Sequence, residues 1–415
     1  MKKQTQWMLA AILLCGASVF TSCNDDNDDT PANNSVVDLA KVTKAYTAKD
    51  GETLTGTLAE VAQITVADGA SITLKDVSIN AEGEVYSESK FSGITCQGDA
   101  TITLSGTNVI RGFDNFYPAI FVPENHTLTI QGDGSLDVKG SGDFTIMCAA
   151  IGSVRAGATS GNIVILGGQI TAEGGDNSAA IGASYASTCG NITIGGTADL
   201  TIVGSNKGAG IGTGSGPYEE MSICGDITIG GEAMVDATGI PAIGAFCFGK
   251  CGNITIGEEA YVKAQGVDCA PGIGCGNSYS WCRDITISGG TVIASCDDYG
   301  PGIGTSSCSY SICKSITITG GSVLATGGED GPGIGSGPDN TYGIPIVITS
   351  GATKVTAIRG SEAADFIGTG VNGTRGSVTI DGVENATPAS TFPNFESVTL
   401  DNRWTLIMPI SLPIH

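Results

Sequence analysis

Aromatic side chains in this chain gather in one kind of turn, just after a short Ile-Gly segment. Only 6% of its 415 residues are aromatic. Aromatic rings pack well on apolar surfaces such as the C–H faces of sugars, so a spaced row of them predicts a site that tracks a polysaccharide. The other interpretation is that the rings fold back and shield the backbone. The glycan-binding row is assigned to Tyr185, Tyr218, Phe246, Tyr279, Trp281, Tyr310 and Tyr342, and Phe248 lies in the same turns.

Acidic residues precede the Ile-Gly segments. Stacked carboxylates could hold Ca²⁺ through oxygen ligands. However, the Gly-Gly-x-Gly-x-Asp rhythm of Ca²⁺-binding β-rolls is missing, and Asp is common in solvated Gly-rich turns. We therefore favour ordinary turn chemistry and expect neither a resident cofactor nor a metal. The acidic positions are Asp176, Asp268, Asp297, Asp298, Glu329, Asp330 and Asp365.

Cysteine recurs at one position of the repeat, three residues before a short β-branched run. In-register stacking would place neighbouring members ~4.8 Å apart, which lies within the Cα range of disulfides. A ladder of small buried thiols fits equally well, so both interpretations stay open. Zinc is disfavoured because the chain has only two histidines, His126 and His415. The column comprises Cys189, Cys224, Cys251, Cys282 and Cys313, and Cys247, Cys275 and Cys308 lie in the turns before it.

These residues must be positioned by a repeating unit, which is marked by eight Ile-Gly pairs 30 to 33 residues apart. A fixed period of this length indicates one stacked unit repeated along an axis. The pairs begin at Ile151, Ile181, Ile211, Ile243, Ile273, Ile303, Ile334 and Ile367.

Each repeat contains three short extended segments separated by Gly-rich turns. Thirty extended residues at ~3.3 Å each give a path of roughly 100 Å, which suits one triangular coil. We predict an all-β fold, a right-handed parallel β-helix with about 30 residues per coil and about 11–12 coils with terminal caps. A polar position before each Ile-Thr-Ile run predicts a hydrogen-bonded ladder between coils. This ladder would contain Asn162, Asn191, Asp226, Asn253 and Asp284.

The N-terminus is typical of an exported lipoprotein. Two basic residues and a short apolar stretch end in Phe20-Thr21-Ser22-Cys23, which predicts lipidation of Cys23 and a location on the outer membrane, exposed at the cell surface. An ordinary secretory signal is the alternative. The predicted organisation is a signal peptide at 1–22, an acidic flexible tether at 23–35, an N-terminal cap at 36–60, the β-helix at 61–387 and a C-terminal cap at 388–415.

The chain is strongly acidic, with a net charge of −23. Loss of Lys2 and Lys3 with the signal leaves 17 basic against 42 acidic residues, a net charge of −25. This balance excludes nucleic acid as a partner and disfavours polyanions. A polysaccharide or host glycan is easier to accommodate, and the lipid would be the only membrane anchor. The oligomeric state is not determined by these features.

Residues 251–257 (Cys-Gly-Asn-Ile-Thr-Ile-Gly) and 331–337 (Gly-Pro-Gly-Ile-Gly-Ser-Gly) carry a resemblance to known repeats. Together with 320–328 they resemble repeats of surface proteins from gut Bacteroidetes and Firmicutes, and residues 93–130 resemble the lead-in to such arrays. The likeness covers about residues 45–385. It implies a β-helical, lipid-anchored protein and supplies no catalytic motif.

Three functions remain in view. The first is a non-enzymatic surface module that binds glycan or adheres through the aromatic edge. The second is a β-helical polysaccharide lyase or glycoside hydrolase, which is disfavoured because the unbroken period leaves no inserted loops to build a cleft. The third is a purely structural spacer. The few basic candidates for lyase chemistry are scattered singly, at Arg155, Lys207, Lys250, Arg283 and Lys314.

Overall fold

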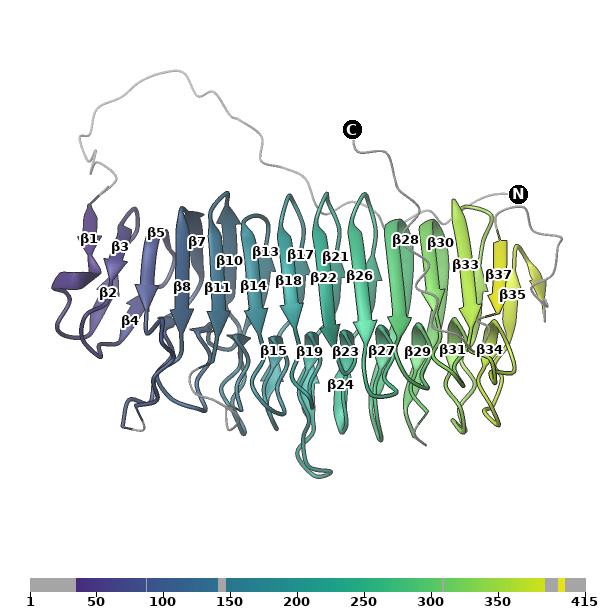
Figure 1. The fold of residues 1–415 in the computed structure, drawn as a ribbon. Helices are drawn as coiled ribbons and strands as arrows, with labels where there is room; N and C mark the ends of the chain where they lie inside the picture. The colour runs from purple at the N-terminus through teal and green to yellow at the C-terminus, as the bar shows by residue number, and fades with distance from the viewer. Residues whose placement is uncertain (1–34, 87, 141–146, 308–309, 385–394, 400–415) are drawn as a thin grey trace, which may run out of the picture.

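The computed structural model describes residues 35–86, 88–140, 147–307 and 310–384, and the backbone of 395–399. These residues form one elongated coil whose successive turns stack side by side (Figure 1). The predicted signal peptide, Cys23, the acidic tether up to residue 34 and most of the predicted C-terminal cap lie outside the described residues. No helix within the described residues is long and apolar enough to cross a membrane.

One face of the coil is a parallel sheet of twelve short strands, to which each coil contributes one. Ile-Gly pairs start the strands of its C-terminal two thirds. The strands are β2 (Tyr46–Ala48), β4 (Ile64–Val66), β6 (Ile94–Cys96), β9 (Ile120–Phe121), β12 (Ile151–Gly152), β15 (Ile181–Ala183), β19 (Ile211–Thr213), β23 (Ile243–Ala245), β27 (Ile273–Cys275), β29 (Ile303–Thr305), β31 (Ile334–Ser336) and β34 (Ile367–Thr369).

The other faces belong to a continuous sheet of 25 strands, which bends around the remaining corners of the coil. In coil order they are β1 (Val36–Asp38), β3 (Thr53–Thr57), β5 (Ala70–Ile79), β7 (Ala100–Ser105), β8 (Thr107–Arg111), β10 (Thr127–Gly132), β11 (Ser135–Lys139), β13 (Asn162–Ile165), β14 (Gln169–Glu173), β16 (Thr188–Cys189), β17 (Ile192–Ile194), β18 (Asp199–Val203), β20 (Ser222–Cys224), β21 (Ile227–Ile229), β22 (Met234–Gly239), β24 (Gly249–Cys251), β25 (Ile254–Ile256), β26 (Tyr261–Gly266), β28 (Trp281–Cys296), β30 (Ile312–Thr326), β32 (Ile346–Ile348), β33 (Lys354–Arg359), β35 (Val378–Ile380), β36 (Val383–Glu384) and β37 (Phe395–Thr399).

The named strands of the described chain pair in parallel, except for β35 and β36, which are antiparallel. The near strands run downward while the chain advances from its purple end to its yellow end, so the coil is right-handed (Figure 1). The predicted right-handed parallel β-helix with about 30 residues per coil is therefore confirmed.

The hydrophobic core is a set of isoleucine columns inside the coil. Ile243, Ile273 and Ile303 face one another in register and are fully buried. On the adjoining face, Ile254 stands in register with Ile227 and Ile285, and all three are also fully buried. The alternation of buried Ile and outward Thr explains why the Ile-Thr-Ile runs form half-buried strands.

Each Ile-Gly glycine is required by both its backbone and its neighbour. Gly274 has a φ of 135°, in the region that side chains rarely adopt. A Cβ placed there would lie 1.9 Å from the carbonyl oxygen of Gly304 in the next coil. The glycine column therefore allows close backbone stacking at this corner.

The predicted N-terminal cap at 36–60 is already part of the coil. Strand β1 pairs with β3, and β2 pairs with β4. The 3-10 helix η1 (Leu39–Lys41) places Leu39 in the core with no exposed surface. This segment is thus the first coil, and η1 closes its end. At the other end, β36 folds back onto β35.

Candidate functional site

Five aromatic side chains meet along one corner of the coil, in the turns that follow the Ile-Gly strands. We call Tyr218, Phe248, Tyr279, Tyr310 and Tyr342 the aromatic ladder. The ring centroids of Phe248 and Tyr279 are 5.4 Å apart with an interplanar angle of 7°. Those of Tyr279 and Tyr310 are 4.9 Å apart with an angle of 9°. Three successive coils thus hold their rings face to face.

Tyr218, at the N-terminal end of the aromatic ladder, is its most exposed ring. The ring of Tyr218 lies 5.9 Å from Phe248 and 5.7 Å from Tyr279, nearly perpendicular to both. Because it is almost equally far from each, it lies beside the edges of the stacked pair. Tyr218 is 69% exposed. Tyr342 is tilted by 55° against Tyr310 and is 42% exposed.

The three stacked rings stand on left-handed backbone. Phe248, Tyr279 and Tyr310 have φ values of 53°, 55° and 73°. A bulky residue in this region is uncommon and strained, at about 1–3 kcal/mol each. Ala186 has a φ of 50° in the corresponding turn of an earlier coil. The left-handed turn is therefore a feature of the coil that does not require an aromatic side chain.

Buried polar groups hold these turns from below. The hydroxyl groups of Ser280 and Ser311 both donate to the carbonyl oxygen of Gly276, at 2.5 and 2.8 Å. Asn340, which is fully buried, accepts a hydrogen bond from the backbone N–H of Tyr342 at 2.8 Å. Its amide donates to the carbonyl oxygen of Ser311 at 3.1 Å. The turns that carry the aromatic ladder are therefore held rigid by buried polar groups that have hydrogen-bond partners.

Three residues predicted for the glycan-binding row are not part of the aromatic ladder. Phe246 is only 7% exposed and packs with Ile240 and Ala270, so it contributes no surface ring. Trp281 lies on β28, with the Lys250 ammonium 5.3 Å from the centre of its ring. Tyr185 lies at the same corner but in the coil before that of Tyr218, and the Arg155 guanidinium carbon is 5.4 Å from the centre of its ring.

Phe248 takes the place that was assigned to Phe246. A usable signal was present in the sequence: Phe248, Tyr279 and Tyr310 each lie three residues before a member of the cysteine column. Phe246 lies five residues before Cys251, where the turn points its side chain inward. Counting back from the cysteines, instead of forward from Ile-Gly, identifies the ring that joins the stack.

The five column cysteines are buried, stand in register and are free thiols. Of the two open interpretations, the structure has the thiol ladder. Burial raises the pKa of Cys282 and Cys313 well above the usual range. At the N-terminal end, hydrogen bonding from Cys224 lowers the pKa of Cys189. Most of the column thus consists of protonated, enclosed thiols that pack as small apolar groups.

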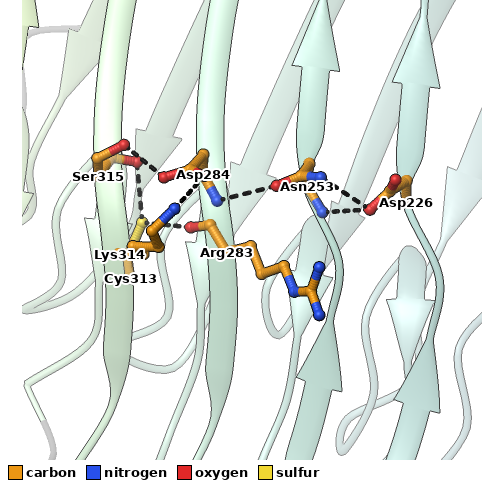
Figure 2. A network of polar contacts seen from close by, with 7 residues as sticks. All are labelled: Asp226, Asn253, Arg283, Asp284, Cys313, Lys314 and Ser315. Atoms are coloured by element: carbon orange, nitrogen blue, oxygen red, sulfur yellow. Dashed lines mark hydrogen bonds and ion pairs between the residues drawn. The ribbon is translucent and has the colours of Figure 1, made fainter.

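Figure 2 shows part of the predicted polar ladder, with Asp226, Asn253, Asp284 and Ser315 on four successive coils. The backbone N–H of Asn253 donates to Asp226 Oδ1 at 2.7 Å. The Ser315 hydroxyl donates to Asp284 Oδ1 at 2.6 Å, and Lys314 Nζ pairs with Asp284 Oδ2 at 2.8 Å. Hydrogen bonds from Lys314 and then Ser315 lower the pKa of Asp284. The predicted ladder of polar side chains, hydrogen-bonded from coil to coil, is confirmed.

Acidic residues gather at the corner where the strands of the large sheet end. Burial, followed by repulsion from Asp268 and Asp298, raises the pKa of Asp297. Among the described residues, no group of three or more His, Cys, Asp or Glu side chains could hold a metal ion.

Comparison with known proteins supports the architecture. Residues 163–185, 285–307 and 316–338 match the family model described as a beta helix repeat. No curated protein matches the chain, and no solved structure does. Each matched segment runs from an Ile-rich strand through an Ile-Gly strand, so the match follows the coil seen in the structure. By its repeats and its fold, the chain is similar to the beta helix repeat family.

Proposed function

We propose that this chain is a non-enzymatic β-helical module that binds a glycan along the aromatic ladder. The observation that carries the proposal is the position of Tyr218, a ring 69% exposed and set beside the edges of two stacked rings. A large aromatic ring held by other rings on rigid backbone offers an apolar platform with a polar hydroxyl group. Such a platform suits the mixed C–H and O–H surface of a sugar.

The middle of the ladder plays a different part from its ends. Both faces of Tyr279 are covered, by Phe248 on one side and Tyr310 on the other. A sugar therefore stacks on Tyr218 or Tyr342, while the hydroxyl groups of Tyr279 and Tyr310 serve as hydrogen-bond donors and acceptors between them. Successive coils are ~4.8 Å apart, so these groups form an evenly spaced row along the rod.

Replacing Tyr218 with alanine is expected to weaken glycan binding about tenfold or more, because exposed aromatic anchors carry much of the energy of such contacts. The melting temperature should change little, since the ring is mostly exposed. Binding to an array of neutral oligosaccharides, followed by titration of any hit, measures the first effect. Replacing Tyr279 is the matched comparison: it should lower stability by about 1.5–4.5 kcal/mol, because its ring contacts with Tyr218, Phe248 and Tyr310 are all lost.

A structural spacer is the second candidate, because the covered faces of Tyr279 also suit a ladder that only staples adjacent coils. The two roles separate cleanly. If no oligosaccharide binds and Tyr279→Ala is destabilising, the ladder is structural and the glycan proposal fails.

We further propose that the module is exported and held at the outer-membrane surface by a lipid on Cys23, as its N-terminal sequence suggests. Changing Cys23 to alanine should move the protein from the membrane fraction to the soluble fraction of the cell envelope. Mass spectrometry of the N-terminal peptide should detect acyl chains in the unaltered protein alone. An unmodified Cys23, or a membrane fraction unchanged by the substitution, contradicts this assignment.

A further inference from the structure

Arg155 is clamped between two aromatic rings on the same corner of the coil as the aromatic ladder. Its guanidinium carbon lies 4.8 Å from the ring centre of Phe116 and 5.4 Å from that of Tyr185. Contacts of this kind hold a planar guanidinium in one orientation and reduce the entropy lost when it binds a ligand. Arg155 is therefore oriented before any ligand arrives.

This guanidinium has no carboxylate partner within the described part of the chain, although the whole sequence contains 42 acidic residues. Arg155 Nε is enclosed and makes no hydrogen bond, and the residue as a whole is half-buried. By contrast, Arg111 pairs with Asp137 at 2.7 Å. An oriented arginine that has no carboxylate partner among the described residues of so acidic a protein is a feature that packing alone does not explain.

The location connects Arg155 with the ladder. The backbone N–H of Ala156 donates to the carbonyl oxygen of Tyr185 at 2.8 Å, which places the two turns on adjacent coils. Ala156 has a φ of 56°, close to the 50° of Ala186 in the next coil. Tyr218 lies in the coil after that, so Arg155 and Tyr218 are separated by two coil spacings, about 10 Å along the rod.

We propose that Arg155 binds the carboxylate of an acidic sugar within an otherwise neutral glycan that lies along this corner. This inference rests on the proposed glycan-binding function and specifies its ligand. The two terminal nitrogens of a guanidinium match the two oxygens of a carboxylate, with two parallel hydrogen bonds. The net charge of −23 disfavours a polyanion, but charges more than ~8–10 Å away are screened, so a single carboxylate responds to the local cation.

The experiment compares sialyllactose with its carboxyl methyl ester, a matched pair in which esterification removes the negative charge and adds a single methyl group. Isothermal titration of the full chain should show the ester binding about tenfold or more weakly, since charge-assisted hydrogen bonds are the strong ones. Arg155→Gln should abolish this preference. Arg155→Lys should retain only part of it, because an ammonium keeps the charge and loses the planar fork.

Lys207→Gln is the control for net charge, because Lys207 is exposed and lies in the turn before the Ile-Gly strand β19, whereas Arg155 lies after the Ile-Gly strand β12. It should leave the preference unchanged, and thermal melts should show that all variants are folded. Equal binding of acid and ester by the unaltered protein overturns the carboxylate site, as does a preference that survives in folded Arg155→Gln. If either of these results is obtained and both sugars still bind through Tyr218, the glycan proposal stands and only this inference fails. If neither sugar and no neutral oligosaccharide binds, both fail.

Discussion

Substituting alanine for Gly274 is expected to destabilise the β-helix by about 2–6 kcal/mol, by adding backbone strain to overpacking. At a φ of 135° a side chain is strained wherever it points. The added methyl carbon would also lie 1.9 Å from Gly304 O, so neighbouring coils would have to separate. Because each coil rests on the next, the lost contacts fall within the central stack.

Gly69→Ala is the matched control. Gly69 also has a positive φ, of 73°, but a Cβ there would have no atom within 4 Å. It should therefore show the conformational penalty alone, about 1 kcal/mol. Urea unfolding followed by circular dichroism measures the free energy of unfolding of both variants. Equal losses in the two variants would mean that close stacking of the glycine column does not limit stability.

Truncating Ile254 to alanine is the second change with a large expected effect, a loss of about 2–5 kcal/mol. Ile254 is fully buried between Ile227 and Ile285 of the adjacent coils. Removing its outer carbons leaves a cavity that the hydrogen-bonded coils cannot collapse to fill. Hydrogen exchange should show the loss of protection concentrated in the flanking coils, because solenoid contacts are between nearest neighbours.

Thr255→Ala tests whether the loss of stability in Ile254→Ala comes from burial of the side chain and not from its position on the strand. Thr255 is the next residue on β25, points outward and faces Thr228 and Thr286 in register. Its replacement should change stability by about 0.5 kcal/mol or less. A comparable loss at both positions would argue that the outer face contributes as much as the core.

The repeat itself could be predicted because its causes are local and periodic. Ile-Gly pairs at 30 to 33 residues, with alternating Ile-Thr-Ile runs, indicate both the strand and the coil length. The register of the cysteine column and of the Asn253 ladder followed from the same period. Stacked coils bring equal positions together, so a regular sequence implies columns.

The site could be predicted only in outline. The turns that contain the aromatic residues vary in length. The repeat spacing therefore does not predict which residue of a turn points outward. Phe248, which has the left-handed backbone, stacks on Tyr279, whereas Phe246 is buried. The rings of Tyr279 and Tyr310 were expected to offer their faces to a sugar, and the structure places those faces against other rings.

The amino-acid sequence alone thus determined the architecture, since hydrophobic alternation and glycine spacing act through short-range sterics and burial. The tertiary structure decided which side chains share a surface. Ring stacking, the clamp on Arg155 and the free thiol of Cys282 each depend on where a variable turn returns to the neighbouring coil. Contacts across coils join residues about 30 positions apart, and their side-chain directions follow from backbone angles that no periodic pattern encodes.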